Sequence, residues 1–193
     1  MNNKGQRLIL PINKCRVTAS YKNSNYKRQF GYTHYGVDMT STDHDKRVWA
    51  SGDGVVTHTG WHPTSGNVVV VIYRDCILLD GTVKDLVIRY FHLDSIRVKP
   101  KQVVCKDTIL AMYGNTGYSS GAHLHIEVDV DTLYPNYTPQ TSKSNDVLKS
   151  GIDTTINPDR VLYVKSSAPD LQYVVDSGYD TVDTLNYLKI LTR

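Results

Sequence analysis

Two short motifs contain the residue types that bind zinc and transfer protons. The first is HYGVD at residues 34–38, and the second is HLHIE at residues 123–127. Imidazole nitrogens and carboxylate oxygens both bind zinc, at about 2.0–2.2 Å. Either motif alone is weak evidence, because such pairs also arise by chance or on solvated faces. Together they indicate one metal site built from two distant segments.

The first motif cannot be a straight strand if both of its ends bind one ion. At about 3.3 Å per residue, the Cα atoms of His34 and Asp38 would lie about 13 Å apart. The chain must therefore curl between them. Gly36 removes the steric obstacle to such a curl.

The second motif predicts a half-buried strand that presents ionisable groups. Alternate side chains of a strand share a face, so His123, His125 and Glu127 would line one face and apolar residues the other. Two imidazoles at this spacing can reach one metal ion. We interpret Glu127 as a residue of the strand surface, with a contact to a histidine N–H as the alternative.

A further histidine, His92, follows an apolar run in YFHL at residues 90–93. A lone histidine there is usually structural, and it gains interest only beside the two motifs. A catalytic zinc keeps three protein ligands and one open position. Spacing does not say which three candidates bind the ion. His44, His58 and His62 match no motif, and we predict that they are surface or loop residues.

Strands must position these motifs. Asp80-Gly81 predicts a hairpin with a type I′ turn, which needs positive φ at both central residues. Several short strands close in sequence favour an antiparallel sandwich or barrel, so the fold class is mainly β. Five runs rich in apolar and β-branched residues predict the strands, namely Gly54–Thr57, Val68–Tyr73, Leu86–Phe91, Ile109–Tyr113 and Leu124–Val130.

Two segments lie outside this pattern. Residues 131–155 are polar and predict a long loop, which we expect to rim a groove and influence substrate choice. Beyond residue 165, apolar residues recur every three positions from Val182 to Leu191 and predict one short amphipathic helix. That helix docks on its own domain or binds a partner. We therefore expect one domain over 1–165 and a C-terminal appendage over 166–193.

Composition excludes several classes of protein. The 193 residues carry a net charge of +3 without a concentrated basic face, which argues against nucleic acid as a partner. No run approaches the roughly 20 apolar residues of a membrane span. The first apolar run, Leu8–Ile12, is too short for a secretion signal. We therefore expect synthesis in the cytoplasm, with release by lysis or within a particle.

The cysteines also limit the chemistry. Cys15, Cys76 and Cys105 are far apart and form no CxxC pair, which excludes a cysteine-rich zinc site. We expect reduced thiols, with Cys76 and Cys105 buried among apolar neighbours.

Taken in order, the motifs resemble the lysostaphin-type zinc endopeptidases. The resemblance covers roughly residues 11–162, and only the ordered set is specific. The chain departs from the family at Lys101 and Asp107, where glycine is usual, and in its long 131–155 connection. The motifs are HYGVD at 34–38, VWASGDGVV at 48–56, YFHL at 90–93, GNTGYS at 114–119, HLHIE at 123–127 and INP at 156–158.

This resemblance implies that His34, Asp38 and His125 hold Zn²⁺ and that His92 and His123 are the unligated catalytic pair. It implies a compact antiparallel β fold, built on a duplicated hybrid motif, with a groove across the metal. The implied substrates are the peptide stems and cross-bridges of peptidoglycan. Zinc would activate a water and polarise the scissile carbonyl, while the two histidines guide the water, protonate the leaving amine and hold the oxyanion.

Two alternatives stay open. A non-catalytic relative would keep the fold and bind cell wall or a partner. A component of a phage-like particle would cut cell wall locally, in the manner of an endolysin or tail protein, and would use the C-terminal appendage as its contact. The sequence does not say which peptide bond would be cut.

Overall fold

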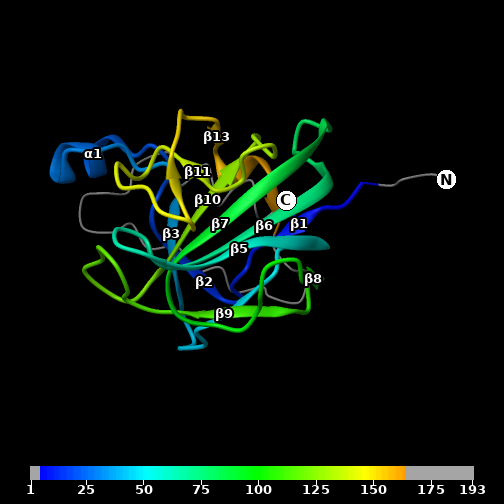
Figure 1. Cartoon of the computed structure of the whole chain (residues 1–193), viewed down its shortest axis with the longest axis horizontal. Coiled ribbons are helices and arrows are strands. Elements are labelled where there is room, and N and C mark those ends of the chain that lie inside the picture. Colours follow the sequence, from blue (N-terminus) through cyan, green and yellow to red (C-terminus); the bar gives the residue numbers. More distant parts are fainter. Residues whose placement is uncertain (1–4, 164–193) are drawn as a thin grey trace.

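A computed structural model describes residues 5–163 of this chain. In it, the apolar and β-branched runs form one large antiparallel sheet (Figure 1). Its strands are β2 (Cys15–Ala19), β3 (Val37–Ser41), β4 (Arg47–Trp49), β5 (Gly54–His62), β6 (Gly66–Ile77), β7 (Val83–Ile96), β8 (Val103–Val104), β9 (Ile109–Tyr113), β10 (Leu124–Asp129) and β13 (Thr155–Ile156). The smaller elements are β1 (Leu8–Ile9), α1 (Ser24–Phe30), β11 (Tyr137–Thr138), β12 (Lys149–Ser150), η1 (Pro158–Arg160) and β14 (Leu162–Tyr163). The mainly β, antiparallel fold predicted from the sequence is confirmed.

Strand order brings the two chemical motifs together. The sheet runs β2-β3-β10-β7-β6-β5-β8, with β9 paired to β7 and to β4. β10 lies between β3 and β7, so that His125 is the register partner of Asp38 on one side and of Phe91 on the other. All five predicted strands are present, and β5, β6 and β7 are longer than predicted.

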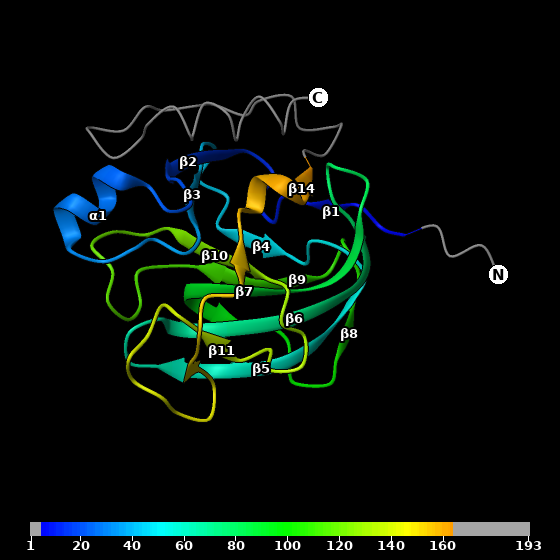
Figure 2. The same ribbon diagram turned by 90° about the horizontal axis from the view of Figure 1, so that it is seen from above.

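Both faces of this sheet are covered. The main core lies on one face and includes Leu124, Ile126 and Val128 of β10. A smaller cluster on the other face packs Leu148 of the 131–155 segment against Val87 and other residues of β6 and β7. Figure 2 shows the ribbon of this segment, with β11, beside β5 and β6. Every residue of β10 is consequently buried. The prediction of a half-buried strand was therefore wrong, because sequence periodicity does not reveal a covering loop.

The long connection is mostly irregular, as predicted. Within it, β11 and β12 form a short parallel pair. The predicted helix near residues 182–191, the appendage at 166–193 and the end of the expected domain lie outside the described residues. Within the part of the chain that the structure describes, no helix has the length and apolarity to cross a membrane.

Two local predictions need correction. The β6–β7 hairpin forms, but Gly81 has φ 83° whereas Asp80 is not at positive φ, so the turn is not type I′. Gly81 N donates to Leu78 O at 3.0 Å, as in a type I turn followed by a left-handed glycine. Cys76 is buried as expected, but Cys105 is exposed because it lies in a surface turn.

Candidate metal centre and active-site cleft

Three donor atoms from the two motifs meet at one point. His34 Nε2 lies 3.0 Å from Asp38 Oδ1 and 3.1 Å from His125 Nδ1, and the latter two atoms are 2.7 Å apart. Tetrahedral zinc with bonds of about 2.0–2.1 Å would separate its ligand atoms by roughly 3.4 Å. The triangle needs to expand by only a few tenths of an ångström. This donor set therefore fits a zinc ion.

The curl predicted in the first motif is present, and the structure gives a second steric reason for glycine at position 36. His34 precedes β3, and the chain bends at Gly36 before Asp38 enters the strand. A Cβ atom on Gly36 would lie 2.2 Å from Ile126 O and 2.6 Å from His125 Nε2. Glycine is thus required because the backbone passes directly against β10.

Hydrogen bonds select which nitrogen of each imidazole faces the cluster. His34 Nδ1 donates to Ser20 O at 2.8 Å, which leaves the Nε2 lone pair for a cation. His125 presents Nδ1, so in the neutral ring the proton belongs on Nε2, which lies 3.9 Å from Glu127 Oε1. Tyr26 stacks on the His34 ring at 4.4 Å between centroids, and Phe91 stacks on that of His125 at 5.3 Å. The two rings are therefore held in orientation before any ion binds.

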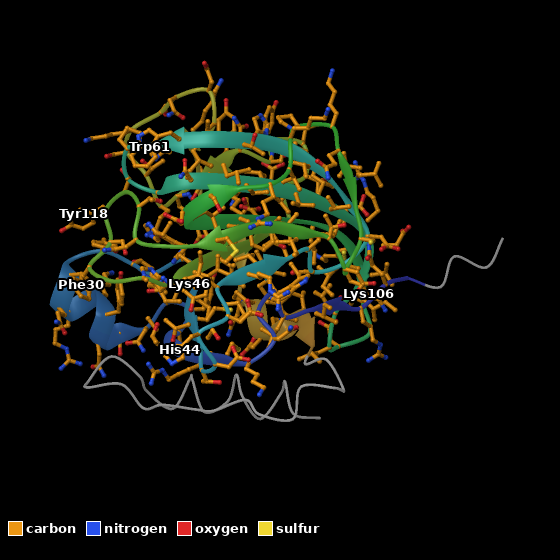
Figure 3. The ribbon with its side chains drawn as sticks, turned by 90° about the horizontal axis from the view of Figure 1, so that it is seen from below. Phe30, His44, Lys46, Trp61, Lys106 and Tyr118 are labelled. Atoms are coloured by element: carbon orange, nitrogen blue, oxygen red, sulfur yellow. The ribbon has the colours of Figure 1, made fainter. Side chains whose placement is uncertain are left out.

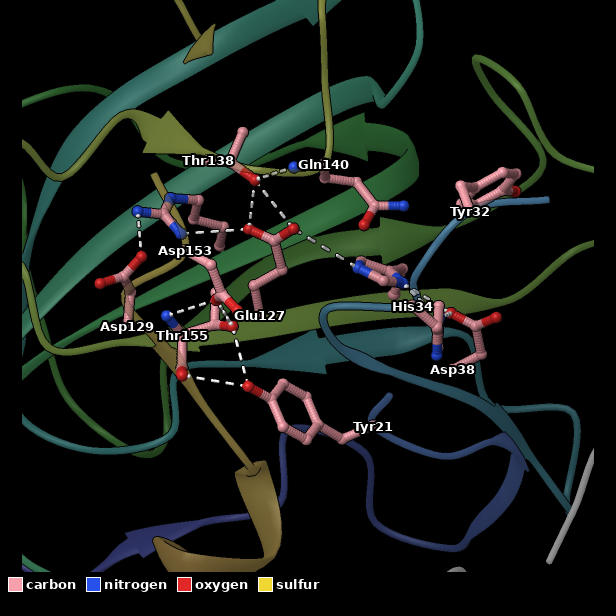
Figure 4. A network of polar contacts seen from close by, with 12 residues as sticks. Tyr21, Tyr32, His34, Asp38, Glu127, Asp129, Thr138, Gln140, Asp153 and Thr155 are labelled. Atoms are coloured by element: carbon pink, nitrogen blue, oxygen red, sulfur yellow. Dashed lines mark hydrogen bonds and ion pairs between the residues drawn. The ribbon is translucent and has the colours of Figure 1, made fainter. Parts of the chain in front are cut away.

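Glu127 belongs to a buried charge network and not to the strand surface (Figure 4). It is fully buried, accepts a hydrogen bond from Thr138 Oγ1 at 2.7 Å, and pairs with Arg89 Nη1 at 3.1 Å. Arg89 also pairs with Asp129 at 2.9 Å and donates to Pro135 O. Our surface interpretation of Glu127 was wrong, because residues 135–138 cover this side of β10. One sequence signal was missed: Arg89 is a charged residue inside the apolar run Leu86–Phe91, and the sheet register makes it the partner of Glu127.

The carboxylate of Asp38 is the electrostatic centre of the cluster. Burial alone would raise its pKa, but the neighbouring His34, His123 and His125 hold that pKa well below its usual value. Burial would lower the pKa of His125, yet its hydrogen bond to Asp38 and the nearby charge of Glu127 raise that pKa to about 9. A site that attracts a proton so strongly also attracts a divalent cation.

His92 and His123 lie beside the three donors. Their ring centroids are 4.9 Å apart, and His123 Nε2 is 3.6 Å from Asp38 Oδ1. His92 Nδ1 donates to Thr116 O and His123 Nδ1 donates to Gly121 O, both at 2.8 Å. These hydrogen bonds favour, in each ring, the tautomer whose Nε2 carries the lone pair and is available to a bound molecule.

A backbone irregularity aims His92. His92 has φ 58°, a backbone conformation that is unfavourable in energy for a residue with a Cβ atom. The register of β7 also shifts near His92, against β6 between Tyr90 and Leu93 and against β9 between Leu93 and Ser95. Burial, with smaller effects from His123 and His125, lowers the pKa of His92 to about 4. The imidazole is therefore neutral near pH 7 and can accept a proton.

These groups form the floor of a cleft of about 530 Å³. One wall is aromatic and comes from α1 and the residues after it, with Tyr26, Phe30 and Tyr32. We did not predict α1, although its Asn23 N-cap and the left-handed Gly31 after its last turn are recognisable signals. The other walls come from residues 118–122, from Thr64 and Ser65, and from Gln140. Figure 3 shows Phe30, Tyr118 and Trp61 along this end of the molecule.

The structure therefore brings all five predicted site residues into one place. His44 is exposed, as expected, and His58 is partly buried in β5. His62 is fully buried, contrary to its prediction as a surface residue. Its Nε2 donates to Lys143 O at 2.8 Å, a contact with a segment 81 positions away that local sequence does not reveal.

Comparisons with known proteins identify the family and several relatives of this chain. The sequence model of peptidase family M23 matches residues 32–137. Peptidoglycan DD-endopeptidase ShyA of Vibrio cholerae is 40% identical over 83 residues, which are 43% of this chain and 17% of ShyA. Lysostaphin of Staphylococcus simulans is 29% identical over 127 residues, 61% of this chain and 24% of lysostaphin. This chain thus spans about a quarter or less of the length of these relatives.

Solved structures share the fold. A zinc containing peptidase from Vibrio cholerae is 30% identical with a TM-score of 0.53, covering 64% of this chain and 37% of that chain. Lysostaphin from Staphylococcus simulans has a TM-score of 0.56 at 23% identity, covering 92% of this chain and 60% of that chain.

Proposed function

This chain belongs to peptidase family M23, and from that premise we propose that it is a zinc-dependent endopeptidase that cuts peptide bonds of peptidoglycan. The observation that carries the proposal is the triangle of His34, Asp38 and His125 donor atoms, of which Asp38 and His125 line the cleft together with two further histidines. Three protein donors with an open side are typical of a catalytic zinc. Two neutral imidazoles and one carboxylate would leave the centre with a net charge of about +1.

In this proposal His34 binds through Nε2, Asp38 through Oδ1 and His125 through Nδ1. When bound, zinc supplies Lewis acidity, lowering the pKa of a coordinated water to about 7 and polarising a carbonyl. Glu127 orients His125 by facing its Nε2–H, and Arg89 offsets the charge of Glu127.

His92 and His123 are the proposed catalytic pair. Hydrogen bonds to Thr116 O and Gly121 O leave both Nε2 atoms as the free nitrogens at the cleft floor. Burial keeps the His92 ring neutral at pH 7, so that its Nε2 lone pair can face the attacking water as a proton acceptor. The protonated ring can then donate to the leaving amine or to the developing oxyanion.

The substrate proposal rests on the relatives. ShyA is named as a peptidoglycan DD-endopeptidase. Direct cross-links between stem peptides and glycine bridges both remain candidate substrates of this chain. Attachment to a phage-like particle was predicted from the segment 166–193, which lies outside the described residues, and it stays a prediction.

The test is hydrolysis of purified cell walls by the wild type and His125→Ala, with zinc measured by elemental analysis. Walls with direct cross-links and walls with glycine bridges should be compared, and mass spectrometry of the released fragments identifies the bond. His44→Asn is the matched control, because it replaces an exposed histidine whose positive φ of 64° asparagine tolerates.

We expect one zinc per wild-type chain and clearing of at least one wall type. His125→Ala should be metal-poor and at least about 100-fold slower, while His44→Asn behaves as wild type. A zinc-loaded wild type that binds walls but releases no peptide fragment would contradict the peptidase and favour the non-catalytic binding module.

A further inference from the structure

The cleft contains polar atoms that nothing in the described part of the chain satisfies. Gln140, Ser65 and Thr40 line the cleft, and one side-chain oxygen of each (Oε1, Oγ and Oγ1) is shielded from solvent and lacks a hydrogen-bond partner among residues 5–163. Ser65 is only 2% exposed. A buried oxygen without a partner costs stability, and such atoms in native proteins call for a partner. Because these residues line the cleft, a rotation of the side chain would bring such an oxygen to a bound molecule as its partner.

Gln140 is held firmly in the long 131–155 segment. Its backbone N–H donates to Thr138 Oγ1 at 3.0 Å, and Thr138 Oγ1 in turn donates to Glu127. The chain of contacts connects Gln140 to the strand that carries His125. Figure 4 shows the carboxamide of Gln140 extending from this segment toward the side on which Tyr32, His34 and Asp38 lie.

Ser65 belongs to the same wall. The buried His62 donates to Lys143 O and accepts hydrogen bonds from Thr64 N and Ser65 N, at 3.3 Å each. The β5–β6 turn and the segment around Gln140 are thereby joined through one imidazole. This wall is rigid before a ligand arrives, which is what a positioning surface requires.

The chemistry of the cleft points to a peptide backbone. Among residues 5–163, the side chains that line it include no lysine or arginine, so the wall around Gln140 has neither of these cations to bind a carboxylate. A carboxamide offers one acceptor and two donors, the complement of a peptide group. A hydroxyl beside it can donate to a second carbonyl.

We propose that Gln140 is a substrate-positioning residue that pairs with a neutral peptide unit of the substrate beside the scissile bond, with Ser65 as its neighbour on the same wall. This inference rests on the proposed function and deepens it. It assigns substrate recognition within the 131–155 segment to a single side chain, since Gln140 is the one residue of that segment that lines the cleft within the described range.

The test measures kcat and KM for Gln140→Ala and Gln140→Glu on a soluble cross-linked stem-peptide dimer and on pentaglycine. Glutamate keeps an acceptor but removes the donors and places a negative charge beside the cleft. Leu133→Ala is the control, because Leu133 is 78% exposed in the same segment and does not line the cleft. Equilibrium binding of both peptides by calorimetry, and zinc content, are measured in parallel.

Loss of one or two neutral hydrogen bonds should raise KM and weaken peptide binding about 3- to 10-fold for Gln140→Ala. Gln140→Glu should be no better than alanine. Zinc content and kcat should stay within twofold of wild type in both variants, and Leu133→Ala should match wild type throughout.

A KM and peptide affinity within twofold of wild type for Gln140→Ala would overturn the inference, and so would an equal loss in Leu133→Ala. The proposed function fails separately, through a wild type that cuts neither peptide. In that case the calorimetric measurement of peptide binding still tests the role of Gln140. Weaker binding by Gln140→Ala than by the wild type supports the inference. Equal binding by the two proteins, or no binding by the wild type, refutes it.

Discussion

Arg89 is the cation on which the buried side of the site depends, and Arg89→Met should expose that dependence. The side chain is fully buried and lies between two fully buried carboxylates, Glu127 and Asp129. Methionine fills much of the same volume but leaves both carboxylates without their cation.

The magnitude follows from this geometry. Removing one partner of a buried ion pair costs about 3–5 kcal/mol, because the remaining charge is left uncompensated. A domain of this kind has a total stability of about 5–15 kcal/mol. With a urea m-value of about 2 kcal/mol/M, the unfolding midpoint should fall by roughly 2 M. Zinc affinity should fall as well, since Glu127 faces the Nε2–H of His125.

Urea unfolding followed by circular dichroism provides the assay, with Arg74→Met as the matched control. Arg74 pairs with Asp85 at the surface, where its side chain is 62% exposed, so its loss should cost at most about 1 kcal/mol. Adding Glu127→Gln and Asp129→Asn to Arg89→Met should recover at least about 2 kcal/mol, because no net charge then stays buried. An Arg89→Met protein within about 1 kcal/mol of wild type, or one that neutral partners do not rescue, would refute the reasoning.

Three further predictions follow from single positions. Gly36→Ala should bind less zinc and melt at a lower temperature, because its Cβ would clash with Ile126 O. Elemental analysis and thermal unfolding measure the two effects. A wild-type zinc content would show that the backbone can move aside there. Lys101→Gly should raise the free energy of unfolding by about 0.5–1 kcal/mol in urea unfolding, because Lys101 has φ 70°, which glycine adopts without strain. A loss of stability would mean that the lysine side chain stabilises the fold by more than its backbone conformation destabilises it. His92→Gln should reduce the pH dependence of the free energy of unfolding between about pH 4 and pH 6.5, measured with EDTA present. The pKa of His92 is about 4 in the folded chain and about 6.5 in the unfolded chain, so the unfolded chain binds more protons in this window. The wild type should therefore gain up to about 3 kcal/mol of stability as the pH rises through it. The same slope in His92→Gln as in wild type would assign it to other groups.

The covering segment at 131–155 also contacts the residues that lie next to the His34, Asp38 and His125 cluster. Thr138 and Pro135 make hydrogen bonds to Glu127 and Arg89. A deletion that removes residues 135–138 should therefore weaken zinc binding as well as change substrate preference. The coupling arises because the segment returns across the same face of β10 that carries His125.

Much of the protein was predictable from local sequence. β-branched runs specify strands wherever they occur, so β5, β6, β7, β9 and β10 were identified within a few residues. The types of side chain in the two motifs limited the chemistry to metal binding and proton transfer. Their order along the chain indicated the family, to which a match over residues 32–137 now assigns it.

Tertiary structure decided the rest, because the decisive contacts join distant positions. His125 and Asp38 are 87 residues apart, and only the pairing of β10 with β3 brings their donor atoms to 2.7 Å. Whether Glu127 is solvated or buried depends on a segment that begins several residues later and folds back over it. The pattern within a strand reports which side chains share a face. It carries no information about what packs against that face, and here that packing makes Glu127, Arg89 and Gln140 parts of the site.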